Sequence, residues 1–143
     1  MEPYLLNITD FKLRRQLSRF RLSNHNLHIE KGRHAKPKTP VEQRLCNVCN
    51  NKMIEDEFHF ICVCKKYDDL RDYFFKKMVA MGFYGNFFKL NDILNFSEGS
   101  LAVAKFLTKM FKRRKVRHNF RIGPVDLHSN SVNNRRSNNA VRQ

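Results

Sequence analysis

The chain has 143 residues, enough for one domain with tails, and carries a formal net charge of +15. Its hydrophobic share of 41% is below the usual range for globular domains, so we expect the packed part to be smaller than the chain. No apolar run approaches the length of a membrane span. Met1 is followed by Glu2 and Pro3 without the apolar core of a signal peptide. We therefore expect an intracellular protein of the nucleus or cytoplasm, with no membrane partner.

The charge is unevenly distributed along the chain. Residues 1–45 carry 10 basic and 4 acidic side chains, residues 46–111 carry 9 and 8, and residues 112–143 carry 9 and 1. This pattern predicts three parts: a basic helix and loop arm (1–45), a folded unit (46–111), and a basic helix end with a disordered tail (112–143). Two cationic flanks favour a polyanionic partner, RNA or DNA. A merely solvated surface is the alternative.

The first 45 residues predict a helix and then a loop. From Thr9 to about Leu22, apolar residues recur near helical spacing, which predicts an amphipathic helix with Asn7 as a candidate cap. From Ser23 to Arg44, the glycine, prolines and polar residues predict a basic loop with at most a short extended piece.

The stretch from Cys46 to Cys64 holds all four cysteines of the chain. Cys46, Cys49, His59 and Cys64 form the pattern Cys-x2-Cys-x9-His-x4-Cys, and three thiolates with one imidazole are a donor set that Zn²⁺ prefers. Glu55 to Phe60 predicts the first turns of a helix, with acidic residues near its positive end and His59 aimed inward.

We interpret this stretch as a structural zinc site in a small, mainly α domain. Disulfides or plain burial of the cysteines are the alternatives. The identity of the fourth ligand also stays open. Cys62 lies three residues after His59, on the same face if the helix continues, whereas Cys64 requires the helix to end.

The second half of the chain predicts three helices. They span Tyr67 to Gly82, Leu90 to Phe96, and Ser100 into the basic cluster that begins at Lys112. We expect the apolar stripe of the first, which includes Tyr73, to face the core, and Gly82 to stop that helix.

Basic side chains of the first helix, the loop and the end of the last helix are the candidate phosphate contacts. They are Arg14, Arg15, Arg19, Arg21, Lys31, Arg33, Lys36, Lys38, Lys112, Arg113, Arg114 and Lys115. The chain has neither a glycine-rich phosphate loop nor a Gly-x-Ser-x-Gly motif. Because four protein ligands would close the zinc site, no coordination position is left for a substrate. We therefore predict that the chain is not an enzyme.

Several of these segments, taken together, resemble a known family. They are Leu17 to Leu22, His28 to Arg33, Arg44 to Cys49, Ile54 to Phe60, and Cys64 to Arg71. This order is similar to the C-terminal zinc-binding region of reverse transcriptases from non-LTR (LINE-like) retrotransposons, and the similarity covers about residues 11 to 80. The resemblance implies Cys64 as the last ligand and a module that helps to hold RNA or target DNA. The polymerase and endonuclease domains of that family have no counterpart here, so the resemblance does not imply reverse transcription.

Two alternatives to a nucleic-acid-binding module stay open. The abundance of Phe and Met between Tyr73 and Phe88 would also suit a zinc-stabilised module with a protein partner. The other alternative is that the chain is a truncated retrotransposon fragment without a selected function. The sequence assigns no oligomeric state.

Overall fold

The computed structural model describes residues 1–119, with side chains up to Lys115, and this part of the chain is mainly helical, as predicted. The part of the expected basic tail beyond residue 119 lies outside the described residues. No described helix has the length and apolar character to span a bilayer. The α-helices are α1 (Pro3–Asn7), α2 (Phe11–Arg21), α3 (His28–His34), α4 (Asp68–Ala80), α5 (Leu90–Asn95) and α6 (Ser100–Asn119). Shorter helical turns are η1 (Val41–Gln43), η2 (His59–Val63), which is a π-helix, and η3 (Lys65–Tyr67).

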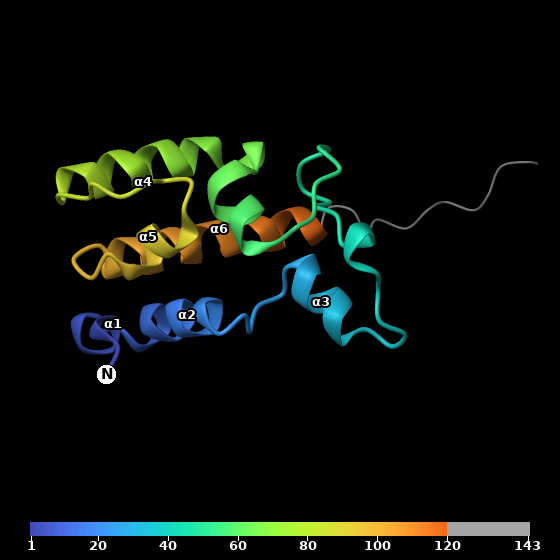
Figure 1. Ribbon diagram of the computed structural model, residues 1–143, viewed down its shortest axis with the longest axis horizontal. Coiled ribbons are helices and arrows are strands. Elements are labelled where there is room, and N and C mark those ends of the chain that lie inside the picture. Colours follow the sequence, from blue (N-terminus) through green and yellow to red (C-terminus); the bar gives the residue numbers. More distant parts are fainter. Residues whose placement is uncertain (120–143) are drawn as a thin grey trace, which may run out of the picture.

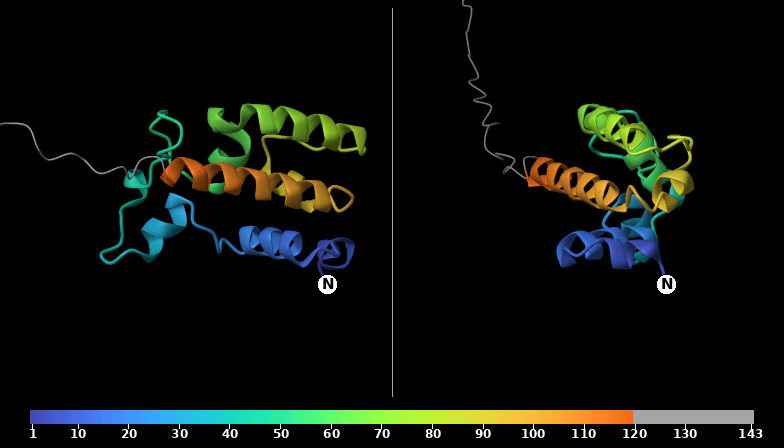
Figure 2. Two further views of the ribbon diagram at one scale, coloured as in Figure 1. Left: turned by 180° about the vertical axis from the view of Figure 1, so that it is seen from behind. Right: turned by 90° about the vertical axis from the view of Figure 1, so that its left-hand side faces the viewer.

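The long helix α6 is the centre of the fold. It lies between α2 and α4, and it also contacts α1 and α5 (Figures 1 and 2). Leu17 and Phe20 of α2 are buried in the same core as Phe111 of α6. Residues 1–45, which we expected to form an arm, therefore contribute to the central packing, because the apolar face of α2 is covered by α6.

Helix α2 begins directly after its capping residue, Asp10. The Asp10 side chain accepts hydrogen bonds from the amides of Lys12 and Leu13, at 2.8 and 3.1 Å. Such a bond satisfies amides that have no partner within the helix. Asp10, rather than Asn7, is therefore the capping residue, and Asn7 belongs to the preceding helix α1.

Helix α3 corrects the expectation of a loop between Ser23 and Arg44. Its interior contains Gly32, a residue that disfavours helices. The Arg44 side chain crosses the helix at this point, and a Cβ on Gly32 would lie 2.6 Å from it. Arg44 also donates to the carbonyl of Ile29 at 3.0 Å. Packing against Arg44 thus explains why Gly32 lies within a helix, although the local sequence around it indicates a loop.

Helix α4 ends as the sequence predicts. Gly82 has φ +85, a left-handed conformation that glycine adopts without steric cost. Phe74 is buried and stacks on Phe106 of α6, with ring centroids 4.1 Å apart. Tyr73, by contrast, is 64% exposed, so its expected place in the core is wrong.

Candidate metal centre

The Cys-x2-Cys pair lies on a tight reversal of the chain. An antiparallel bridge joins Leu45 to Ile54, and the Cys46 amide donates to the Met53 carbonyl at 2.8 Å. Inside this reversal, the Cys49 amide donates to the Cys46 sulfur at 3.5 Å. The backbone therefore directs both sulfurs to the same side of the turn.

His59 and Cys64 are brought together by an unusual helical turn. Asp56 caps the start of this turn, since its carboxylate accepts the His59 amide at 2.7 Å. At its end, the Cys64 amide donates to the His59 carbonyl at 2.7 Å, five residues back, which is the π-helical spacing. Cys64 itself is extended, with φ −61 and ψ 112. The helical turn thus ends at Cys64, as is required if Cys64 is to be the fourth ligand.

Arg71 of α4 fixes this end of the π-turn. Its guanidinium donates to the carbonyls of Ile61 and Cys64, at 2.7 and 2.9 Å, and pairs with Asp68. The Arg71 side chain is itself buried. It therefore holds the backbone of a candidate ligand, a role that the sequence alone did not indicate.

The four candidate ligands meet in one buried cluster. One side-chain donor atom from each of Cys46, Cys49, His59 and Cys64 lies within 4.8 Å of all the others. The Cys49 sulfur is 3.2 Å from Nε2 of His59. Tetrahedral bonds of about 2.0–2.3 Å to one ion would separate such donors by roughly 3.5–3.8 Å. The cluster is therefore compatible in size and in donor chemistry with a closed metal site.

The thiols of Cys46 and Cys64 shift each other's pKa in opposite directions. A hydrogen bond from the Cys64 thiol, helped by one from His59, lowers the pKa of the Cys46 thiol far below its ordinary value despite burial. The same contact with Cys46 and burial raise the pKa of Cys64. A second thiolate is therefore unfavourable beside the first, because two negative sulfurs repel each other in a buried place. A divalent cation would remove this repulsion.

Cys62 is outside the cluster, although it is also buried. Burial raises the pKa of its thiol to about 11, which disfavours the thiolate that a metal needs. The π-helical turn explains why Cys64, and not Cys62, joins the cluster. Its hydrogen bond spans five residues and brings Cys64 back beside His59. The geometry thus places Cys64, the residue implied by the resemblance, beside the other three donors.

A buried ion pair connects the segment between Cys49 and His59 to the central helix α6. The Glu55 carboxylate binds the Arg114 guanidinium through two hydrogen bonds of 2.8 Å, and both side chains are 1% exposed. Glu55 also accepts the amide of His28, at the start of α3, at 2.8 Å. Burial alone would lower the pKa of Arg114, but its bonds to Glu55 raise it. Glu55 therefore joins α3, the cysteine segment and α6.

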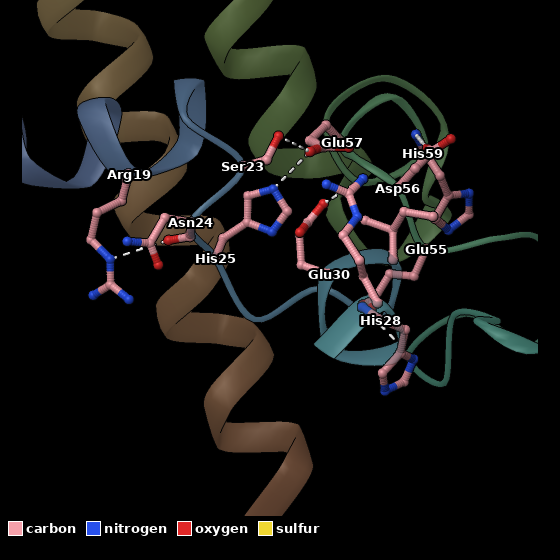
Figure 3. Close-up of polar contacts among 12 residues, drawn as sticks. Arg19, Ser23, Asn24, His25, His28, Glu30, Glu55, Asp56, Glu57 and His59 are labelled. Atoms are coloured by element: carbon pink, nitrogen blue, oxygen red, sulfur yellow. Dashed lines mark hydrogen bonds and ion pairs between the residues drawn. The ribbon is translucent and has the colours of Figure 1, made fainter. Parts of the chain in front are cut away.

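The acidic residues after Glu55 have separate partners. Asp56 caps the turn that holds His59, in agreement with the expected effect of an acidic helix start. Glu57 instead accepts Oγ of Ser23 at 3.1 Å and lies 2.9 Å from Nε2 of His25, as Figure 3 shows. The hydrogen bond from His25 is the main reason that the pKa of Glu57 falls to about 2. These contacts bridge distant segments, which a local pattern cannot reveal.

Eight of the twelve candidate phosphate-binding residues have exposed side chains. Arg19 and Lys115 line one pocket of about 160 Å³ beside His25, at the junction of α2 and α6. Lys31 lines a different pocket, together with Arg44. The exposed set is Arg15, Arg19, Lys31, Arg33, Lys36, Lys38, Lys112 and Lys115.

The other four candidates are held by the protein itself. Arg14 and Arg21 donate to backbone carbonyls. Arg113 pairs with the Asp69 carboxylate. Arg114 is buried against Glu55, so the expectation that it contacts phosphate is corrected: its guanidinium has no route to a ligand outside the core.

No family model matches the chain, and comparison with curated proteins and with solved structures found no match either. The buried cluster and the exposed basic side chains are therefore the observations from which a function can be inferred.

Proposed function

We propose that this chain is a non-catalytic, zinc-stabilised module that binds RNA or DNA mainly through phosphate contacts, and that it derives from or forms part of a retrotransposon reverse transcriptase. The observation that carries the proposal is the buried cluster of Cys46, Cys49, His59 and Cys64. Thiolate-rich donor sets with one imidazole favour Zn²⁺ over the harder Mg²⁺ or Ca²⁺. The retrotransposon origin rests on the resemblance of residues 11 to 80.

A structural role for the zinc is favoured over a catalytic one. Catalytic zinc keeps a coordination position for water or substrate, whereas four protein donors fill the tetrahedron. All four donor residues are also buried, which hinders access of a substrate. The metal would instead join the cysteine turn to the π-helical turn before α4. The ion pair of Glu55 with Arg114 connects this part of the chain to α6.

The nucleic-acid part of the proposal is supported by charge. The chain carries a net charge of +15, and the exposed basic side chains come from α2, α3, the following loop and the end of α6. Flexible lysines and arginines of this kind bind phosphates without reading the base sequence. We therefore expect little sequence preference.

Salt dependence tests this binding mode. If five to eight basic side chains engage duplex DNA, the slope of log K against log salt concentration should be roughly −4.5 to −7, because each neutralised phosphate releases about 0.9 counterion. Fluorescence anisotropy of a labelled duplex across a salt series gives the slope. Binding that does not change with salt would contradict phosphate-dominated recognition.

A protein partner is the second candidate function, and one observation favours it. Beyond the middle of α4, the chain exposes large apolar side chains, among them Tyr84, Phe88 and Val79, which are 97%, 67% and 57% exposed. Retention of a partner protein after nuclease treatment in high salt, and its loss in the variant Tyr84→Ser/Phe88→Ser, would favour this function.

A further inference from the structure

A groove between α4 and α6 combines aromatic and cationic side chains that the proposed phosphate contacts do not include. It measures about 240 Å³, and its lining includes Tyr73, Phe74, Lys77, Lys105, Phe106 and Lys109. Phe74 and Phe106 are buried and stacked, with their ring planes 1° apart, whereas the lysines are exposed. Of the described residues that line the groove, three are lysines and none is acidic.

Tyr73 is the side chain in this groove that a flat ligand could cover. Tyr73 is 64% exposed, and the Lys109 ammonium lies over one face of its phenol ring, 5.5 Å from the ring centroid. An anion drawn to Lys109 is therefore held next to an aromatic face. The groove is smaller than the roughly 300–1,000 Å³ of pockets that take drug-sized ligands, which suits a single flat ring rather than a larger molecule.

The lysines continue from the groove along one side of α6. Lys105 and Lys109 are four residues apart and Lys112 follows three residues later, a spacing that places neighbouring side chains on the same face of a helix. All three are exposed. On α4, the carboxylates of Asp68 and Asp69 are paired with Arg71 and Arg113, whereas Asp72 is exposed and does not line the groove. The row of lysines thus leads from the groove to the basic end of α6.

We propose that this groove binds single-stranded nucleic acid, with a base stacked on Tyr73 and the adjoining phosphates at Lys77, Lys105 and Lys109. Single-strand binding sites combine a cationic groove with aromatic rings that stack on bases. A duplex cannot use such a ring in the same way, because its base faces are covered by neighbouring pairs. The inference rests on the proposed nucleic-acid function and adds the strandedness and the site.

The test measures the affinity of the full chain for a labelled single-stranded oligonucleotide and for the same oligonucleotide with abasic positions. Tyr73→Ala should weaken binding to the intact strand about 5- to 150-fold, which is the effect of one lost stacking contact. Tyr73→Phe should retain the affinity, since phenylalanine keeps the aromatic face. The abasic strand should bind weakly to the unmodified chain and should show little further loss with Tyr73→Ala.

The lysines are tested by their effect on the salt slope. Lys105→Ala/Lys109→Ala should reduce its magnitude by about 1.4 on a single strand, at about 0.7 per phosphate contact. Lys76→Ala is the matched control, because Lys76 is an exposed lysine of α4 that does not line the groove. Circular dichroism should give the same helix content for all these variants, since each replaced side chain is exposed.

Distinct results would overturn the inference. If the unmodified chain binds the strand and both groove variants bind it equally well, the groove is not the site, while the proposed function stands. Tighter binding of duplex than of single strand would also contradict the inference. An acidic peptide with one aromatic residue that binds the chain but not Tyr73→Ala, with oligonucleotide binding unchanged, would assign the groove to a protein. Absence of nucleic-acid binding at any salt would overturn the inference and the proposed function together.

Discussion

Replacing Cys64 by serine is expected to release the metal and unfold the domain, whereas Cys62→Ser should leave the metal bound. Zinc sites in finger peptides contribute about 10–16 kcal/mol, and whole domains are stable by only about 5–15 kcal/mol. Loss of one ligand of the cluster should therefore cost most of the folding free energy. Cys49→Ser and His59→Ala should act like Cys64→Ser. Zinc content and helical circular dichroism of the purified variants are the measurements.

Cys62→Ser is the matched control for this experiment. Its side chain is buried in the same turn, but outside the cluster. We expect a cost of about 1–3 kcal/mol, as for a polar group buried in a protein core. Metal release by Cys62→Ser, with metal retained in Cys64→Ser, would show that the ligand assignment is wrong.

Arg114→Met is expected to destabilise the domain by about 3–5 kcal/mol, because it leaves the buried Glu55 carboxylate without its partner. Glu55→Met/Arg114→Met should recover part of this loss, since the unpaired charge is removed, although the amide of His28 loses its acceptor. Urea unfolding followed by circular dichroism measures these differences in the free energy of unfolding.

Lys112→Met is the control for the role of Arg114. Lys112 lies two residues away on α6 and is exposed, so the change in stability should stay within about 0.5 kcal/mol. It should instead reduce the magnitude of the salt slope on duplex DNA by about 0.9. If Arg114→Met retained full stability and weakened nucleic-acid binding, Arg114 would be a phosphate contact rather than the buried partner of Glu55.

The sequence predicted those parts of the fold that depend on local patterns. The helical class and the course of α2, α4, α5 and α6 follow from apolar spacing and from stop signals such as Gly82. The cysteine and histidine spacing selected Cys46, Cys49 and His59 of the cluster, and for the two cysteines a Cys-x2-Cys turn needs only local geometry. The choice between Cys62 and Cys64 could not be made from helical spacing, since a π-turn does not follow α-helical periodicity.

Long-range contacts were the part that the sequence did not reveal. Glu55 and Arg114 are 59 residues apart, and each belongs to a local charge cluster that suggests a solvated or ligand-binding surface. Helix α3 was missed because Gly32 is explained only by the Arg44 side chain that crosses it. In both cases a polar or helix-breaking residue owes its place to a partner from another element.

A structural zinc site is tested by zinc stoichiometry, from elemental analysis of the purified protein, together with circular dichroism before and after chelation. We expect one zinc ion per chain and loss of helical signal when the metal is removed, because the cluster of Cys46, Cys49, His59 and Cys64 joins the cysteine turn to the π-helical turn before α4. A metal-free protein whose helicity is unchanged by chelator would show that zinc does not stabilise this fold.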